Sequence, residues 1–194
     1  SAIASKSREN AQNFAMQNQL SAWYGSYEEM LEKEMPDCVY IAVLPNAHYD
    51  LTMLCLRHHV PVLCEKAMFM DGAEAANAIR YAKEQGVFFM EALWSRFLPA
   101  IQQAKAWLES GRIGQPAFCD VVIGFLAPEG AENRFRCAAL GGGAAHDILV
   151  YAYELTTYLF PDVPDEICAT AVWGETGVDM TDHVMLRLGG TLAS

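Results

Sequence analysis

The sequence has 194 residues, of which 53% are hydrophobic and 19% are charged, a balance typical of a globular protein rather than a disordered one. The formal net charge of −11 argues against nucleic acid or an anionic membrane surface as the main partner. The sequence shows neither a run of 18 apolar residues nor a charged-then-apolar leader, so we expect no membrane span and no export.

The first half of the chain alternates strand and helix patterns. We predict strands near residues 1–4, 39–44, 60–64 and 87–90, and helices after Ser7, after Ser26 and over residues 47–59 and 73–85. Ser7 and Ser26 are suitable N-caps, the second as part of a capping box with Glu29, and Gly86 is a suitable C-terminal stop. This alternation predicts a Rossmann-type doubly wound parallel sheet.

The pattern changes near Trp94. We predict a helix from Pro99 to Gly111, a strand over 117–125, a loop over 129–143, a helix over about 144–160, strands over 167–173 and 183–188, and a further strand from Thr191. Successive strands joined by turns indicate a mostly antiparallel sheet. We therefore expect two domains, a dinucleotide-binding domain over 1–93 and a second α/β domain over 94–194.

Six cysteines are scattered along the chain, and no two have the spacing of a metal-binding knuckle. We therefore predict no metal site. Several cysteines lie in apolar runs, where a small buried residue is the simplest interpretation. This interpretation favours a reducing, cytoplasmic compartment.

Several motifs, taken together and in order, carry a resemblance that covers nearly the whole chain. They are VYIAVLPNAHYDLTMLCLRHHVPVLCEKA, FFMEALWSRFLPA, GRIGQP, LGGGAAHDILVY and ETGVDMTDHVMLRL. The sequence resembles the glucose–fructose oxidoreductase, inositol dehydrogenase and MocA-type family, and within it the dimeric dihydrodiol dehydrogenases. The resemblance implies a Rossmann domain followed by an α/β domain with an open sheet. It also implies hydride transfer between a nicotinamide cofactor and a carbinol carbon of a sugar, polyol or diol.

The resemblance assigns the catalytic residues. Lys66 matches the lysine of the family's Glu-Lys-Pro motif, a general acid/base on the substrate hydroxyl, although Ala67 replaces the proline. Asp147 and Tyr151 match the Asp-x-x-x-Tyr motif, and their i, i+4 spacing places both on one face of a helix. From periodicity alone, Tyr151 would instead be an amphipathic core residue.

The resemblance also assigns cofactor contacts. Ser5, Lys6 and Ser7 follow a strand where an NAD site would have an acid, and hydroxyls with a base suit the 2′-phosphate of NADP. NAD remains the alternative cofactor, and a plain helix cap with a solvated lysine is the alternative interpretation of the segment. The other cofactor contacts that the resemblance implies are Pro45, Asn46, His48, Glu65, Trp94 and Arg96.

Two parts of the family pattern are missing from the sequence. The glycine-rich phosphate loop and first Rossmann strand would precede residue 1, and the final strand is cut short, so the chain reads as truncated at both ends. The first hypothesis is an oxidoreductase that acts on a small molecule and forms a homo-oligomer, a dimer or a tetramer. The alternative is a non-catalytic relative that serves as a binding or interaction module.

Overall fold

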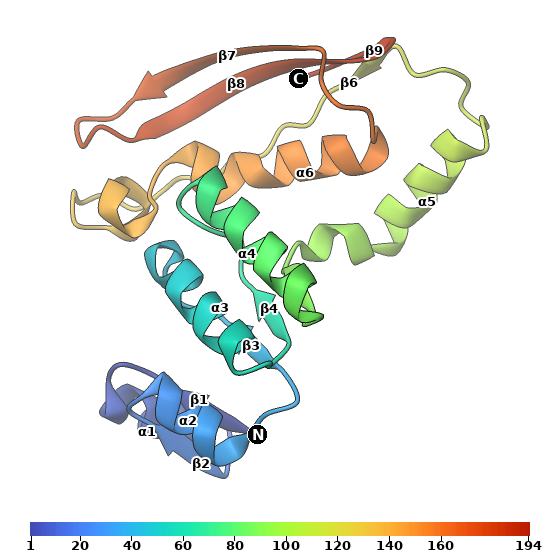
Figure 1. Ribbon diagram of the computed structural model, residues 1–194. Coiled ribbons are helices and arrows are strands. Elements are labelled where there is room, and N and C mark those ends of the chain that lie inside the picture. Colours follow the sequence, from blue (N-terminus) through green and yellow to red (C-terminus); the bar gives the residue numbers. More distant parts are fainter. The chain divides into compact units, whose positions relative to one another are not determined.

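The computed structural model describes residues 1–194, which divide into two compact units, Ser1–Ala92 and Leu93–Ser194. The first unit consists of β1 (Ala2–Ala4), α1 (Arg8–Gln17), β2 (Ala22–Tyr24), α2 (Tyr27–Glu34), β3 (Val39–Ile41), α3 (His48–Arg57), β4 (Val62–Cys64), α4 (Gly72–Gln85) and β5 (Phe89–Glu91). The strands form a parallel β1–β2 pair and a parallel sheet in the order β3-β4-β5. The fold class predicted for this half is confirmed (Figure 1).

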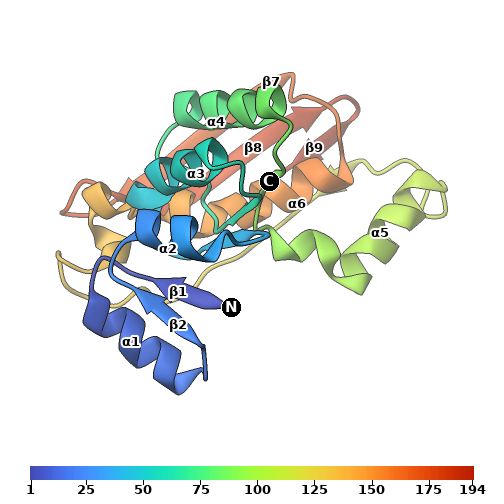
Figure 2. The ribbon, with the colours of Figure 1, turned by 60° about the horizontal axis from the view of Figure 1, so that its bottom comes forward.

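Short polar caps fix where the first helices begin. The hydroxyl of Ser7 accepts from the backbone N–H of Asn10 at 3.2 Å, and that of Ser26 accepts from Glu29 at 3.3 Å. Both predicted N-caps are therefore confirmed. The Glu29 carboxylate bonds Lys33 at 2.7 Å, one turn along α2. Figure 2 shows α1 and α2 on opposite sides of the β1–β2 pair.

The core of the first unit forms where α3 and α4 pack with the three-stranded sheet. The buried apolar cluster includes Ile41, Leu56, Val62, Cys64 and Ala78. Phe69 lies between two other rings, edge-on to Tyr49 at 5.4 Å and stacked with Phe89 at 5.8 Å between centroids. Such ring contacts stabilise a core beyond simple area burial. They also fix the chain just after Lys66.

The second unit contains α5 (Pro99–Glu109), β6 (Phe118–Cys119), α6 (Val150–Leu159), β7 (Glu166–Trp173), β8 (Asp179–Leu188) and β9 (Thr191–Ala193). Its sheet has the order β6-β9-β8-β7, in which only the β6–β9 pair is parallel. The predicted, mostly antiparallel sheet is therefore present. Helix α6 lies along one face of this sheet (Figure 1).

Two local predictions were wrong, and one strand was not predicted. The strand over 117–125 ends at Cys119, because its only partner strand is β9, which pairs with it through Leu192 and Ala193. Strand β2 was not predicted, since its three residues carry little periodic signal. The helix expected from about residue 144 starts as a π-helical turn over Ala145–Leu149 before continuing as α6.

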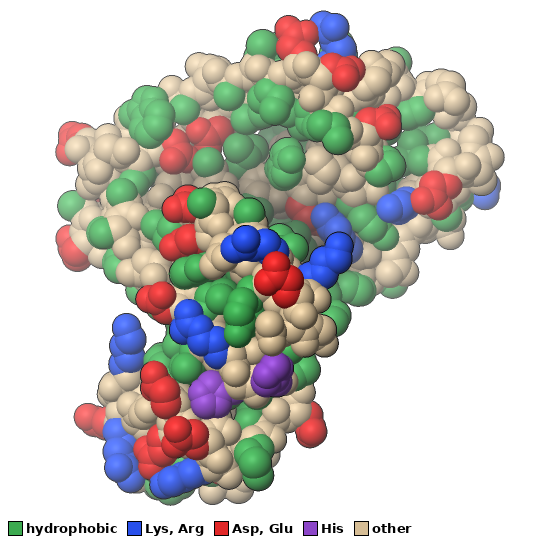
Figure 3. Space-filling model, in the orientation of Figure 1, with side chains coloured by type: hydrophobic (Ala, Val, Ile, Leu, Met, Phe, Trp, Pro, Cys, Tyr) green, Lys and Arg blue, Asp and Glu red, His purple; other side chains and the backbone are tan.

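The surface carries both acidic and apolar side chains. In the space-filling view, acidic groups are spread over both units instead of forming one patch (Figure 3). Large apolar side chains are also exposed on the strands of the second sheet, among them Ile167, Val172, Trp173 and Met185. None of the helices combines the length and the apolar character that crossing a membrane requires.

Candidate active site

In the first unit, several of the predicted site residues directly follow the carboxyl ends of parallel strands. Glu65 and Lys66 come directly after β4, the middle strand of the β3-β4-β5 sheet. Pro45 and Asn46 lie in a 3-10 turn after β3, and Asn46 is exposed. Ligands of open parallel sheets bind at this edge. The strand order therefore gathers predicted cofactor residues with the predicted acid/base.

Glu65 is held by two hydrogen bonds beside Lys66. Its carboxylate accepts from the Tyr40 hydroxyl and, through Oε2, from the backbone N–H of Lys66 at 3.2 Å. Both Glu65 and Lys66 are half-buried. The acid at the end of β4 thus has a fixed orientation, and the lysine side chain starts from an anchored backbone.

The backbone after Lys66 is fixed by groups from neighbouring strands. The Lys66–Ala67 peptide bond is cis. The N–H of Met68 donates to Oε1 of Glu91 at 2.7 Å, and Glu91 is the last residue of β5. The carboxylate at the end of β5 therefore fixes the segment that follows β4, its neighbour in the sheet.

His48 does not lie at the surface as a cofactor contact would. It is fully buried, with Nδ1 3.0 Å from the carbonyl oxygen of Ala67 and Nε2 3.1 Å from that of Val43. The ring therefore links the loop after β3 to the loop after β4. The expectation of a direct contact between the His48 ring and the cofactor does not fit this burial.

The segment that follows β1 presents hydroxyls and bases. The Ser5 hydroxyl accepts from the N–H of Ser7 at 3.2 Å, and Ser7 caps α1, so both side chains are oriented. Lys6 and Arg8 are exposed, and no acid lies between Ser5 and Arg8. Both hydroxyls still have a hydrogen to donate, which suits an anionic ligand group.

In the second unit, Asp147 and Tyr151 project from the start of the long helix. Asp147 belongs to the π-helical turn, a feature often found at functional sites, and its Oδ1 lies 3.4 Å from Nη1 of Arg134. The indole Nε1 of Trp94 donates to the Tyr151 hydroxyl at 3.0 Å, and the two rings meet edge-on. Each predicted residue therefore has a defined partner.

Sequence reasoning missed the groups that anchor the Trp94 segment. Glu154, one turn after Tyr151, is 2% exposed and accepts from the Ser95 hydroxyl at 2.7 Å and from the Arg96 guanidinium. A glutamate inside an apolar helix pattern was the available signal, because a buried charge requires a partner. Arg96 thus serves as that partner in this structure.

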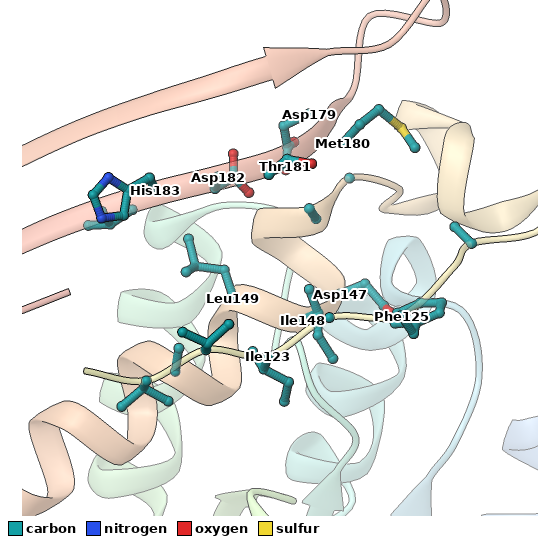
Figure 4. A pocket seen from close by; sticks show the side chains of 18 of the residues that line it. Ile123, Phe125, Asp147, Ile148, Leu149, Asp179, Met180, Thr181, Asp182 and His183 are labelled. Carbon is teal, nitrogen blue, oxygen red and sulfur yellow. The ribbon is translucent and has the colours of Figure 1, made fainter. Parts of the chain in front are cut away.

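A cavity of about 330 Å³ in the second unit is lined by β8, the 120–127 segment and the helix that starts at Ala145. Figure 4 shows Asp179 and Asp182 on β8 at this cavity. Burial, followed by a hydrogen bond with Asp179 and the charge of Asp179, raises the pKa of Asp182 to about 6. Asp179 Oδ2 also accepts from the N–H of Ala145 at 2.5 Å, which ties β8 to the π-helical turn.

Two glycines allow the loop before Ala145 to lie close to β8 and to the Arg134 segment. Gly143 has a φ of +118°, and a side chain there would meet the Asp179 carboxylate. A Cβ on Gly142 would lie 2.7 Å from the carbonyl oxygen of Arg134. The glycine run therefore packs the loop against β8 and the Arg134 segment.

Two family models match the chain. The first, described as an oxidoreductase family with an NAD-binding Rossmann fold, matches residues 1–93, and the second, the GFO/IDH/MocA C-terminal domain, matches residues 101–194. The chain is 34% identical over 193 residues to the trans-1,2-dihydrobenzene-1,2-diol dehydrogenase of Xenopus tropicalis and 31% identical to the human protein of that name. It spans about 57% of the first relative and 56% of the second, each time with 97% of its own length.

Solved structures share the fold at low identity. GenD2 from gentamicin A biosynthesis, solved with NAD, superposes with a TM-score of 0.89 at 18% identity over 100% of this chain and 56% of that one. The WlbA dehydrogenase from Bordetella pertussis, solved with NADH and UDP-GlcNAcA, gives 0.88 at 19% identity, over 99% and 61%. The alternative of a non-catalytic module finds no support in these matches.

Proposed function

Because the chain belongs to the Gfo/Idh/MocA oxidoreductase family, we propose that its protein is an NADP-dependent dehydrogenase that acts on CH–OH groups. The substrate is a small sugar, polyol or diol, and the names of the curated relatives favour a vicinal diol on a six-membered ring. The first unit binds the dinucleotide. The second unit supplies substrate contacts.

The position of Lys66 carries this proposal. It stands at the carboxyl end of the middle parallel strand, next to a carboxylate held by Tyr40, and its backbone is fixed on both sides. When a secondary alcohol becomes a ketone, the hydroxyl proton must leave as the C–H hydrogen is transferred. The Lys66 amine accepts that proton, and its ammonium returns it in the reverse direction.

The residues of the first unit fit a nicotinamide dinucleotide phosphate, which supplies the hydride acceptor when bound. The oriented hydroxyls of Ser5 and Ser7, with the exposed Lys6, would hold the 2′-phosphate. Pro45, Asn46 and Glu65 would contact the ribose and nicotinamide side, because they follow the ends of β3 and β4. Trp94 and Arg96, which belong to the second unit, are proposed as further cofactor contacts.

Asp147 and Tyr151 are proposed to orient the substrate hydroxyls. Asp147 carries a carboxylate held by Arg134, and Tyr151 carries a hydroxyl held by Trp94. A carboxylate accepts and a phenol donates, so the pair can bind two neighbouring hydroxyl oxygens in a defined orientation. Orientation of this kind lowers the barrier by fixing the reacting carbon.

We further propose a cytoplasmic homo-oligomer. All six cysteines are free, which suits a reducing compartment. The exposed apolar side chains on β7 and β8 provide a surface on which a second copy could pack. Light scattering of the full-length protein measures the oligomer, and a monomer at micromolar concentration would contradict this part.

The test is oxidation of a panel of alcohols by the full-length protein, followed by absorbance at the reduced nicotinamide band. The panel contains trans-dihydrodiols, inositols and aldoses, each with NADP and with NAD. We expect turnover with at least one diol or sugar and a higher kcat/KM with NADP. No turnover with any pair, although NADPH binds, would overturn the proposal.

A further inference from the structure

The carboxylate of Glu154 is the most deeply buried charged group in the second unit, at 2% exposed. It accepts from the Ser95 hydroxyl at 2.7 Å and from the Arg96 guanidinium. Ser95 is itself buried at 4% exposed. A buried carboxylate is stable only when hydrogen-bond or charged partners surround it. We call Glu154, Ser95 and Arg96 together the Glu154 cluster.

The Glu154 cluster lies beside the contact between Trp94 and Tyr151. Residues Trp94–Phe97 form one 3-10 turn, and Tyr151 and Glu154 are three residues apart on α6, on one face of the helix. Glu154 holds the two residues that follow Trp94. The Glu154 cluster therefore fixes the backbone of the Trp94 segment, from which the indole Nε1 donates to the Tyr151 hydroxyl at 3.0 Å.

The direction of that hydrogen bond matters for chemistry. An indole N–H can only donate, so the oxygen of Tyr151 is the acceptor. The indole therefore fixes one side of the Tyr151 oxygen, and the edge-on ring contact fixes the phenol ring.

We propose that Glu154 is a positioning residue: through Ser95 and Arg96 it holds Trp94, and the indole in turn keeps the Tyr151 side chain in the orientation that the proposed reaction requires. The proposal rests on the proposed dehydrogenase function, in which Tyr151 contacts the substrate. Glu154 itself touches neither substrate nor cofactor. It acts on the rate by setting the orientation of Tyr151.

A kinetic double-mutant cycle separates positioning from general support of the fold. Glu154→Gln keeps the size of the side chain and loses its charge, and Trp94→Phe removes the indole donor and keeps a ring. In the full-length protein we expect Glu154→Gln to lower kcat about tenfold. In the Trp94→Phe background the same change should alter kcat less than twofold. An equal effect in both backgrounds would overturn the proposal.

Glu166→Gln is the matched control, because Glu166 forms an exposed ion pair with Arg187 at 2.5 Å in the same unit. It should leave kcat unchanged. Ser95→Ala removes one donor to Glu154 without altering any charge, so it serves if Glu154→Gln folds poorly. It should lower kcat in the wild-type background only, and an equal loss in both backgrounds would again contradict the proposal.

A second readout needs no turnover. With 5-fluorotryptophan incorporated, the fluorine resonance of Trp94 is identified by its loss in Trp94→Phe. Glu154→Gln should shift or broaden that resonance, and Glu166→Gln should not. An unchanged resonance would show that Glu154 does not set the Trp94 position. If the wild-type protein shows no turnover, the proposed function fails, and this resonance alone decides the positioning role.

Discussion

Lys66 is the residue on which the proposed chemistry depends most directly. It follows β4, with its backbone N–H bonded to Glu65. We predict that Lys66→Ala in the full-length protein lowers kcat by about 100-fold or more, because the proton of the substrate hydroxyl loses its acceptor. The Kd for NADPH, measured by fluorescence titration, should change less than threefold. Lys83→Ala, on the exposed side of α4, is the control; equal turnover in the two variants would remove Lys66 from the mechanism.

Asp182 makes stability depend on pH. Burial, the hydrogen bond with Asp179 and the charge of Asp179 raise its pKa from 3.8 to about 6 in the folded state. Between about pH 4 and pH 6 the folded state therefore binds more protons than the unfolded state, so the free energy of unfolding falls as pH rises through this window. Above about pH 6 Asp182 is ionised in both states, and its unfavourable ionisation in the folded state lowers the free energy of unfolding by the full amount.

We therefore predict that Asp182→Asn raises the free energy of unfolding at pH 7.5 by on the order of 1 kcal/mol, a figure reduced for solvent screening. At pH 4 the variant and the wild type should differ little from this cause. Urea unfolding at both pH values measures the difference. Asp162→Asn, an exposed aspartate in the same unit, is the control. A gain of equal size at pH 4 and pH 7.5 would show that ionisation of Asp182 is not its source.

Site residues differ in how far sequence can identify them. Lys66, Asp147 and Tyr151 lie in short motifs that resemble a family, so the sequence alone can propose them as site residues. The contact of Glu154 with Ser95 spans 59 residues, and only the folded chain brings them together. The same holds for His48, whose burial depends on carbonyl groups from two loops.

At the scale of elements, the helix caps determine local stability. Asp71 caps α4 by accepting from the N–H groups of Ala73 and Glu74 at 2.8 and 2.9 Å. We predict that Asp71→Ala lowers the free energy of unfolding of the first unit by about 1 kcal/mol. Thermal unfolding followed by circular dichroism measures the loss, and Asp37→Ala, on the exposed turn before β3, is the control. Equal Tm values for Asp71→Ala and the control would contradict the role of the cap.

The accuracy of the predicted elements follows from the strength of their local signals. Helices with a serine or glycine at the end, such as α1 and α4, carry their own start or stop signal, so their limits were close. Strand pairing is a property of two distant segments. Residues 120–125 alternate like a strand, but β6 ends at Cys119, just before Val121 donates its N–H to the carbonyl oxygen of Ser194, the residue after β9. The π-helical turn at Asp147 likewise depends on packing, since Ala145 is bonded to Asp179 of β8.

At the scale of the whole molecule, the two units are expected to respond differently to ligands. The change of pattern near Trp94 predicted two domains, and the contacts within the chain divide it between Ala92 and Leu93. A ligand that binds only folded protein stabilises the part that it contacts by mass action, by about 2.7 kcal/mol at 100 times its Kd. The proposed cofactor residues other than Trp94 and Arg96 all lie in the first unit.

We therefore predict that NADPH in excess slows amide hydrogen exchange chiefly in the first unit, at the segments after β1, β3 and β4. The β7–β8 hairpin should exchange at nearly the same rate with and without NADPH, because none of the proposed cofactor residues lies on it. NADH at the same concentration should protect the segment after β1 less, since it lacks the 2′-phosphate that Ser5, Lys6 and Ser7 are proposed to bind. Equal protection of that segment by the two nucleotides would argue for NAD as the cofactor. Protection confined to the second unit would contradict the assignment of the dinucleotide to the first.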